Sequence, residues 1–386
     1  MSQPNDIYIS AACRTPMGAF LGQFAKLPAT ALGERAIAGL LSRTQLDPAL
    51  IDEVLMGCVL AAGLGQAPAR QAALGAGIPV SVPCTTINKV CGSAMKTVML
   101  GHDMIKAGSA SLVIAGGMES MSRAPHLMMQ TRSGYKLGHQ RLLDHLLHDG
   151  LENPYDGRHM GEIAEDLAQG LDISRAVQDA YAVESSNRAL NAAANGAFDD
   201  EMVDMEGAKD QLPAPPDLIK LASLRPAFRT NGTITAANAS SISDGAAALL
   251  LGNGEQLDKL DLPCLARIVG HASHAQAPDE FTLAPIGVIR KLLDKVAWQI
   301  DDVDLFEINE AFAVVVVAAE RELGLDHAKV NVNGGACALG HPIGASGARI
   351  LVTLIYALLQ RGLKRGVACL CIGGGEATAV AIEIID

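Results

Sequence analysis

Two segments of the sequence place a reactive side chain at a bend that leads into a helix-forming run. His341 lies in the glycine-dense segment 331–349, and Cys91 is followed by Gly92 and Ser93. An imidazole can change its charge near neutral pH, and a thiol at a helix N-terminus is expected to ionise more readily. These residue types indicate a nucleophile and a base. The alternative for a lone cysteine is a small buried side chain.

Two further residues lie at the ends of expected strands. Cys371 precedes three glycines, where a thiol can be exposed and backbone N–H groups can face an oxyanion. Asn309 follows the apolar strand 303–308 at the point where a helix begins, so it is either a polar site residue or a helix cap. Ser240 and Asp244 are expected to cap a helix over 245–251.

The chain repeats itself, because three landmarks recur in the same order. Ile51, Cys91 and Gly116 of the first copy correspond to Ile300, His341 and Gly373 of the second. Each copy predicts a helix after the bend (95–107 and 345–361) and then a short apolar strand that ends in glycines. Two such units predict a largely parallel, helix-covered sheet, with the bends of Cys91 and His341 facing one ligand.

The stretch between the copies differs in composition and is predicted to be an inserted lid with an amphipathic helix over 174–194. Its final part, 218–229, carries Lys220, Arg225 and Arg229 and no acid. On an acidic chain this is the best local site for an anion. The alternative is a solvated charged face.

Composition limits the function classes. The 386 residues carry a net charge of −12, which argues against a broadly basic nucleic-acid binder. Eight cysteines without a Cys-x-x-Cys pair argue against a zinc site and a disulfide scaffold, and favour a reducing compartment. The first residues show no secretory signal, and no run is long enough to span a membrane. We therefore expect a cytoplasmic protein.

Seven motifs, taken together, resemble those of the thiolases, and within them the acetyl-CoA C-acetyltransferases. They occur in the family's order and span nearly the whole chain. The matching stretches are Asn88-Lys-Val-Cys-Gly-Ser93, Gly116-Gly-Met-Glu-Ser-Met-Ser122, His159-Met-Gly161, Asn238-Ala-Ser240, Asn309-Glu-Ala-Phe312, Gly340-His-Pro-Ile-Gly-Ala-Ser-Gly-Ala-Arg349 and Cys371-Ile-Gly-Gly-Gly375.

The resemblance implies an α/β fold of duplicated βαβαβαββ domains that form a layered α/β/α/β/α core. The implied N-terminal domain comprises residues 1–120 plus 236–265. An inserted loop domain covers 121–235, and a C-terminal domain covers 266–386.

The implied activity is the reversible Claisen condensation of two acetyl-CoA to acetoacetyl-CoA and CoA, through an acetyl-Cys91 intermediate. His341 would accept the Cys91 proton, and Cys371 would be the second acid and base. His341 and a water held by Asn309 would stabilise one oxyanion. The N–H groups of Cys91 and Gly373 would stabilise the other. No metal or redox cofactor is expected.

The resemblance also implies a path for CoA and its pantetheine arm. The matching residues are His159, Met160, Leu224, Ala227, Phe228, Ser240, Ala311 and Phe312. The expected small-molecule partners are acetyl-CoA, acetoacetyl-CoA and CoA, with no nucleic acid and no membrane. The chain is expected to form a homodimer or homotetramer, with 130–144 as an intersubunit loop.

Several positions depart from the family's usual pattern. Ala94 replaces a glycine, and with Leu283 it is expected to tighten the acyl pocket and favour short chains. Glu376 is expected to disfavour the Cys371 thiolate if its side chain points inward. No tyrosine occurs between 201 and 224, so potassium dependence is not expected.

Three alternatives stay open. One is a broader-chain 3-ketoacyl-CoA thiolase of fatty-acid β-oxidation. A decarboxylating β-ketoacyl synthase is the second, although the motif at Cys371 supplies a base that decarboxylation does not need. The third is a non-catalytic acyl-CoA-binding protein, against which the full set of Cys91, His341, Cys371 and Asn309 argues.

Overall fold

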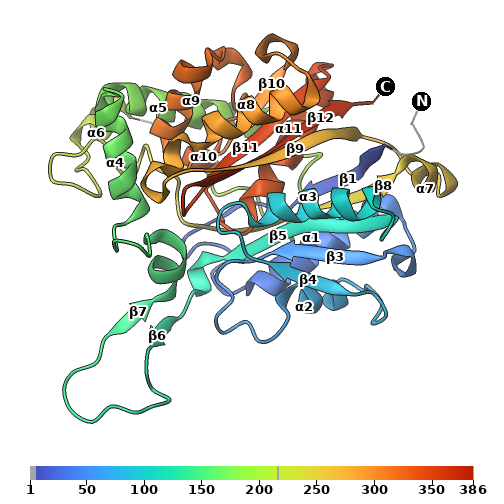
Figure 1. Cartoon of the computed structure of the whole chain (residues 1–386), viewed down its shortest axis with the longest axis horizontal. Coiled ribbons are helices and arrows are strands. Elements are labelled where there is room, and N and C mark those ends of the chain that lie inside the picture. Colours follow the sequence, from blue (N-terminus) through green and yellow to red (C-terminus); the bar gives the residue numbers. More distant parts are fainter. Residues whose placement is uncertain (1–5, 215–216, 386) are drawn as a thin grey trace.

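The computed structural model describes residues 6–214 and 217–385, which form two similar α/β halves joined by one mixed sheet (Figure 1). The strand order is β10-β11-β12-β9-β1-β8-β5-β3-β4, with β2 beside β8, and β6 and β7 form a separate hairpin. The strands are β1 (Ile7–Arg14), β2 (Gly18–Ala19), β3 (Glu53–Gly57), β4 (Cys84–Ile87), β5 (Leu112–Ser120), β6 (His126–Met128), β7 (Leu142–Asp144), β8 (Ser243–Asn253), β9 (Ala266–Ala275), β10 (Leu305–Ile308), β11 (Arg365–Ile372) and β12 (Glu376–Ile384).

The helices cover both faces of this sheet and the edge where the inserted segment lies. They are α1 (Ala29–Thr44), α2 (Pro68–Gly75), α3 (Ser93–Lys106), α4 (Met160–Gly170), α5 (Arg175–Ala194), α6 (Leu218–Ser223), α7 (Gly254–Lys259), α8 (Ala284–Val296), α9 (Ala313–Leu323), α10 (Ala336–Leu339) and α11 (Ser346–Arg361). The predicted helices at 95–107, 174–194 and 345–361 are thus confirmed as α3, α5 and α11.

The internal duplication is visible in the strand pairings. In the first half β3 pairs parallel with β5, β5 antiparallel with β8, and β8 antiparallel with β1. In the second half β10, β11, β12 and β9 pair in the same order and the same directions. The halves meet where β1 pairs with β9. The repeat inferred from the sequence is therefore confirmed.

Five layers follow from how the helices pack. The helices α3 and α11 pack on each other and lie in one apolar core with strand residues of both halves. A second core joins α1 and α2 to the outer face of the first half, and a third joins α8 and α9 to the outer face of the second. Because both faces of α11 are covered, most of its residues from Ser346 to Leu358 are buried. The expected α/β/α/β/α layering is confirmed.

Two expectations were wrong. The sheet is mixed, because only the pairs β3–β4, β3–β5 and β10–β11 are parallel. The expected helix over 245–251 is a central part of strand β8, so Ser240 and Asp244 cap no helix there. Both faces of β8 are buried, and a strand buried on both faces has a continuous apolar run that periodicity cannot distinguish from a buried helix.

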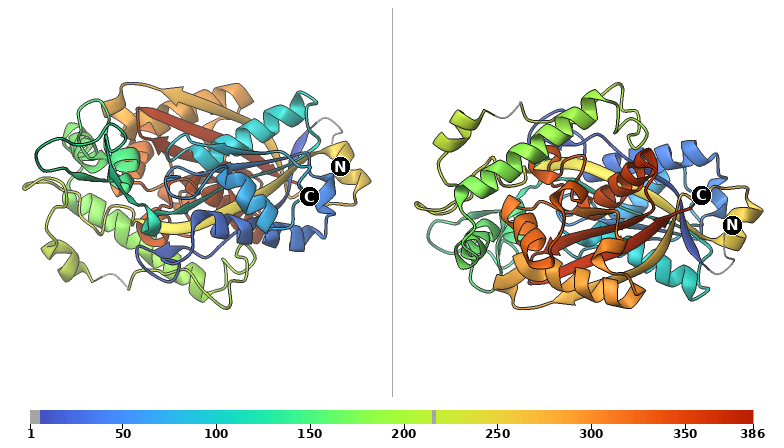
Figure 2. Two further views of the ribbon diagram at one scale, coloured as in Figure 1. Left: turned by 90° about the horizontal axis from the view of Figure 1, so that it is seen from below. Right: turned by 90° about the horizontal axis from the view of Figure 1, so that it is seen from above.

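The inserted segment lies along one side of the molecule, and the β6–β7 hairpin protrudes from the body on the side opposite both termini (Figures 1 and 2). Residues 129–141 of the hairpin are mostly exposed, and the side chain of Leu137 is 96% exposed.

The predicted division into three domains stays a prediction. Residues 1–5, 215–216 and 386 lie outside the described residues. The expectation of no secretory signal depends on the first of these segments and is therefore not addressed by the structure. Among the described helices, none has the length and apolarity that a bilayer span needs.

Candidate active site

A cavity of about 380 Å³ lies where the two halves meet the inserted segment, and it brings together Cys91, His341, Cys371 and Gly373. All the predicted site residues line it except Asn309 and Leu224. Its other lining residues are Met121, Gly150, Leu151, Thr235, Ala236, Ala239, Ser241, Ile242, Phe281 and Ile343. Sequence reasoning did not assign these ten. Three of them (Met121, Ala239 and Ile343) lie inside the quoted motifs, and most of the other seven are apolar residues outside any motif.

The bend that carries Cys91 is held in an uncommon conformation. Val90 has a φ of 47°, which is rare for a β-branched residue and is tolerated where the surrounding structure enforces it. Ser93 enforces it, since its Oγ accepts from the Lys89 N–H at 2.8 Å and donates to the Val90 carbonyl at 2.6 Å. The bend therefore presents Cys91 just ahead of α3, as the sequence predicted.

The Cys91 and Cys371 segments are in direct contact. A Cβ placed on Gly92 would lie 2.3 Å from Cδ1 of Ile372, so a larger residue beside the nucleophile would require the Ile372 side chain to move. Lys89 forms an ion pair with Glu376, which joins the Cys91 bend to the start of β12. The Glu376 carboxylate is thus compensated by a lysine, and the anticipated repulsion on Cys371 is offset.

Burial dominates the ionisation of Cys91. It raises the pKa of the thiol to about 11, and the Glu119 carboxylate adds to the rise. Hydrogen bonds from the N–H groups of Gly373 and Cys91 itself oppose this increase in pKa. The expectation of readier ionisation was therefore wrong in its net direction, because the desolvation of the thiolate outweighs its N–H donors. Cys91 needs a base.

His341 is the candidate for this base, because its hydrogen bonds leave one ring nitrogen free to accept a proton. Its Nδ1 lies 2.6 Å from Oγ of Ser346, whose own proton goes to the Pro342 carbonyl at 2.9 Å. This network assigns the ring proton to Nδ1 and leaves the lone pair on Nε2. Burial, with a smaller effect of Arg349, lowers the pKa of His341 to about 3. The imidazole is consequently neutral at physiological pH with a free lone pair on Nε2, and the imidazolium that it forms needs the opposite charge of the Cys91 thiolate in the same cavity.

Asn309 supports His341 without lining the cavity. Its Nδ2 lies 3.5 Å from Nε2 of His341, and its N–H donates to the Cys369 carbonyl at 2.9 Å. It is not a helix cap, since α9 begins at Ala313 after Phe312. Within the described part of the chain, no group donates to the buried Oδ1 of Asn309. That oxygen is available to a water.

Cys371 is the penultimate residue of β11 and is almost fully buried. Burial raises the pKa of its thiol well above the ordinary value, and the charges of Cys91 and Cys369 raise it further. The glycine turn that follows opens the strand, and Gly374 and Gly375 have φ values of 93° and 87°. Cys371 is therefore a neutral thiol in the resting protein, which can donate a proton.

Aromatic side chains form one part of the cavity wall. The rings of His159 and Phe228 are stacked with centroids 4.7 Å apart, and Phe312 meets Phe228 edge-on at 6.0 Å. Gly161 allows this packing, since a Cβ there would lie 2.3 Å from the Phe228 ring. Leu224 lies away from the cavity, and its carbonyl accepts from Arg175 at 3.3 Å.

The acyl pocket is not shaped by the residues that the sequence suggested. Ala94 is fully buried in the core that surrounds α3, and Leu283 packs in the core beneath α8. Neither lines the cavity. Met160 is closer to the reacting atoms, because a Cβ on Gly373 would lie 3.5 Å from its sulfur.

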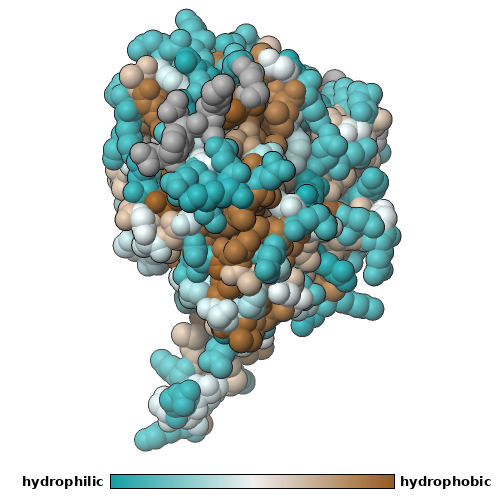
Figure 3. All heavy atoms as spheres, turned by 90° about the vertical axis from the view of Figure 1, so that its right-hand side faces the viewer, coloured by the Kyte–Doolittle hydropathy of each residue, from teal (hydrophilic) through white to brown (hydrophobic). Residues whose placement is uncertain are grey.

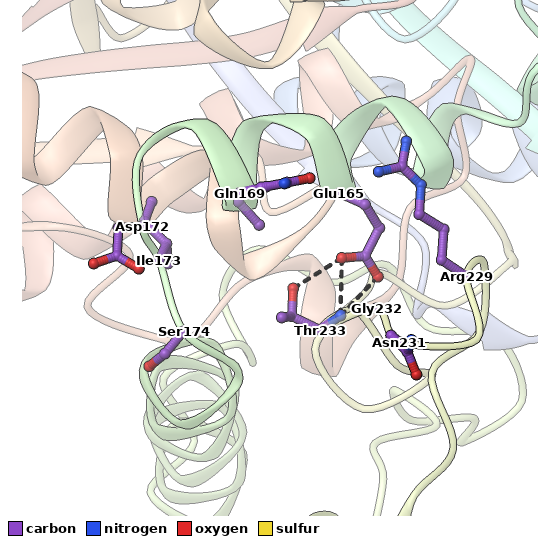
Figure 4. A pocket seen from close by; sticks show the side chains of 10 residues that line it. Glu165, Gln169, Asp172, Ile173, Ser174, Arg229, Asn231, Gly232 and Thr233 are labelled. Atoms are coloured by element: carbon purple, nitrogen blue, oxygen red, sulfur yellow. Dashed lines mark hydrogen bonds between the residues drawn. The ribbon is translucent and has the colours of Figure 1, made fainter.

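A second cavity of about 460 Å³ lies between α4 and the loop 229–233, and it bears on the predicted anion site (Figure 4). Arg229 there is paired with Asp166 at 2.6 Å, and Glu165 accepts from the N–H and hydroxyl of Thr233. Lys220 is 3.8 Å from Asp217. Two of the three basic side chains thus already have acidic neighbours, so the prediction of an anion site at 218–229 now depends mainly on Arg225.

Glu119 is a residue whose role sequence reasoning missed. It is fully buried, and its carboxylate accepts from the N–H groups of Val59, Leu60 and Gly344 at 3.0–3.2 Å. The carboxylate thereby joins the loop after β3 to the loop that carries His341. The sequence did offer a signal for this role, because Glu119 is the one charged residue near the end of the otherwise apolar strand β5.

Replacing Glu119 with glutamine is expected to change how stability depends on pH. Burial raises the pKa of Glu119 from 4.5 to about 7. A raised pKa contributes stability that is present below pH 4.5 and is lost as the pH rises through 7. Relative to the variant, the free energy of unfolding should fall by about 3 kcal/mol across this window. Urea unfolding at both ends of the window measures it, and parallel pH profiles of the two proteins would contradict it.

Comparisons with known proteins cover nearly the whole chain. Residues 7–255 match the family model for the thiolase N-terminal domain, and residues 262–384 match that for the thiolase C-terminal domain. An "Acetyl-CoA acetyltransferase" of Schizosaccharomyces pombe is 49% identical over 98% of each chain. "Acetyl-CoA acetyltransferase 2" of Arabidopsis thaliana is 50% identical over 99% of this chain and 98% of its own length. The crystal structure of the Bacillus anthracis acetyl-CoA acetyltransferase superposes with a TM-score of 0.95 at 40% identity, covering 98% of this chain and 99% of that one. The chain belongs to the thiolase family.

Proposed function

We propose that the protein is an acetyl-CoA C-acetyltransferase, which condenses two acetyl-CoA to acetoacetyl-CoA and CoA and cleaves acetoacetyl-CoA in the reverse direction. The observation that carries this proposal is one cavity that holds Cys91, His341 and Cys371, with two N–H groups directed at the Cys91 sulfur. Relatives named acetyl-CoA acetyltransferase, about half identical over nearly the full length, support the same activity.

In the first half-reaction His341 Nε2 takes the Cys91 proton, and the sulfur attacks the thioester carbonyl of acetyl-CoA. The N–H groups of Cys91 and Gly373 stabilise the oxyanion that forms. The C–S bond to CoA then breaks, and the CoA sulfur leaves with the proton from His341. The product is an acetyl thioester on Cys91. Because one thioester replaces another, this step is close to balanced in energy.

In the second half-reaction Cys371 gives its thiol proton to Nε2 of His341, and the resulting thiolate removes a proton from the methyl group of a second acetyl-CoA. Acetylation of Cys91 helps, because it abolishes the thiolate charge that raises the pKa of Cys371. The negative charge moves to the thioester oxygen, where His341 and a water held by Asn309 stabilise it. The carbanion attacks the acetyl carbonyl, the C–S bond to Cys91 breaks, the Cys91 sulfur leaves with the proton from His341, and acetoacetyl-CoA forms. In cleavage, the neutral Cys371 thiol protonates the departing carbanion.

No metal or redox group is proposed for this reaction. The thioester already acidifies the α-carbon, and no electrons are exchanged with a second substrate. The charges that develop are met by N–H groups, an imidazole and a thiol in a mostly apolar cavity, where such donors act strongly. CoA and its acetyl and acetoacetyl thioesters are therefore the only small-molecule partners proposed.

Mass spectrometry of the protein after incubation with acetyl-CoA tests the proposal. One added acetyl group, located on the peptide that contains Cys91, is the expected result. An unmodified protein that still consumes acetoacetyl-CoA would rule out the acetyl-Cys91 intermediate.

The enzyme is expected to prefer a four-carbon substrate. The cavity of about 380 Å³ is lined near Gly373 by Met160 and elsewhere by Phe281 and Phe312, and its volume leaves little space for a long acyl chain beside pantetheine. Rates of CoA-dependent cleavage with C4 and C16 3-ketoacyl-CoA measure this preference. Faster cleavage of C16 would instead support the broader-chain thiolase of β-oxidation.

Assembly into a homodimer or homotetramer is part of the proposal. Strand β4 is an edge of the large sheet, and an unpaired edge can continue into a second copy. The hairpin segment 129–141 is exposed, and the face near the termini carries a band of hydrophobic side chains (Figure 3). Light scattering tests the prediction, and a monomer at micromolar concentration would contradict it.

All eight cysteines are free, which supports the proposed cytoplasmic location.

A further inference from the structure

A cluster of two histidines and an aspartate lies outside the active site, where α3 of the first half approaches β9 of the second. Nε2 of His271 lies 3.2 Å from Nδ1 of His102 and 2.9 Å from Oδ1 of Asp103. The third side of the triangle, from His102 Nδ1 to Asp103 Oδ1, is 3.0 Å. The cluster is about three turns along α3 from Cys91, or roughly 16 Å, so the proposed reaction does not use it.

Hydrogen bonds alone leave one side of this triangle unfavourable. If both ring nitrogens donate to the carboxylate of Asp103, two N–H groups face each other across 3.2 Å. If only one of the two ring nitrogens carries a proton, that N–H can donate to both other atoms. The unprotonated nitrogen of the other ring then faces the Asp103 oxygen, and two lone pairs repel each other. A cation above the triangle would satisfy all three atoms at once.

We propose that His102, Asp103 and His271 bind a divalent transition-metal ion of the Zn²⁺, Co²⁺ and Ni²⁺ class. Two imidazoles and one carboxylate are ligands that these ions prefer. With bonds of about 2.0–2.1 Å, neighbouring ligand atoms are about 2.9 Å apart at right angles and about 3.3 Å apart in a tetrahedron. The three observed separations, 2.9–3.2 Å, fall in this range.

The surroundings keep the ligands ready to bind. His271 is 9% exposed, and the Lys295 ammonium donates to its backbone carbonyl at 3.0 Å. The rings of His102 and His271 are edge to face, with centroids 4.9 Å apart at 84°. The Asp103 side chain is 54% exposed, so water can reach the remaining coordination positions.

A bound ion would connect the two halves of the fold. His102 and Asp103 belong to α3, which packs in the central layer, and His271 belongs to β9, which pairs with β12 of the second half. An ion bound here connects segments 169 residues apart in sequence. Because an ion that binds the folded protein shifts the unfolding equilibrium, the melting temperature should rise with metal concentration.

Titration of the chelator-treated protein with Co²⁺ tests the proposal by absorption spectroscopy. The expected spectrum shows d–d bands without the intense charge-transfer absorption that a thiolate ligand gives, which separates this site from Cys91 and Cys371. His271→Gln and the exposed Asp103→Asn should each weaken Co²⁺ binding by about 100-fold or more, since loss of even an outer partner costs 10–100-fold.

The matched control is His148→Gln. His148 is 3.8 Å from Glu152, and among the described residues no third ligand lies beside this pair, so its replacement should leave Co²⁺ binding and the metal-dependent rise in melting temperature unchanged. Circular dichroism verifies that the variants fold. The proposal is overturned if the wild type binds no Co²⁺, if binding survives both ligand replacements, or if the bound ion shows thiolate absorption.

Discussion

Replacing Cys91 with alanine is expected to lower turnover by roughly 10⁴-fold or more, because the attacking atom is lost and the other thiol of the cavity, Cys371, serves as the acid and base. The Cys91→Ala protein should also fail to take an acetyl group from acetyl-CoA. The side chain lines the cavity and the smaller alanine leaves α3 unchanged, so the protein should still fold.

Cys371→Ala provides the matched control, since this second thiol of the same cavity has a different role. Its loss should slow condensation and cleavage by about 10²–10⁴-fold, the usual contribution of a general acid or base. The exchange of labelled CoA into acetyl-CoA requires only Cys91 and His341, so it should continue. Exchange and carbon–carbon bond formation are therefore measured separately for each variant. Equal loss of both reactions in Cys371→Ala would contradict the division of roles.

Replacing Arg14 with methionine is expected to destabilise the fold by about 3–5 kcal/mol, the range for removing one partner of a buried ion pair. The guanidinium is fully buried and binds both carboxylate oxygens of Asp210, at 2.7 and 2.8 Å. Its Nε donates to Glu201, which is also fully buried. Methionine would leave the Glu201 carboxylate without its cation in a site that excludes water.

This ion pair also joins the inserted segment to the core, because Arg14 ends β1 while Glu201 and Asp210 belong to 121–235. Urea unfolding measures the loss. Lys259→Met is the matched control, since its pair with Glu255 is exposed and such pairs contribute little. An unchanged urea midpoint for Arg14→Met would show that the buried charges are compensated in another way.

The reacting residues can be located from the sequence because their signals are local. Cys91, His341 and Cys371 each lie where a strand or helix pattern is interrupted by glycines, and the internal repeat relates the first two to each other. The resemblance to the thiolases supplies their roles and most of the cavity wall. The resemblance also supplies the layered fold, whereas the repeat alone indicated a largely parallel sheet.

Other features depend on burial or on long-range contacts and could not be read from the sequence. The apolar run at 245–251 fits a helix as well as a strand, and only its position between β1 and β5 decides. The raised pKa of Cys91 results from desolvation that no local pattern reveals. His102 and His271 are brought together only by the fold.

The most direct test of the proposed activity is to incubate the pure protein with acetoacetyl-CoA, with and without free CoA, and to follow the 3-ketoacyl thioester. The proposed mechanism predicts loss of acetoacetyl-CoA only when CoA is present, with two acetyl-CoA formed for each molecule consumed. No loss with CoA present, for this or any longer chain, would contradict a thiolase reaction at Cys91.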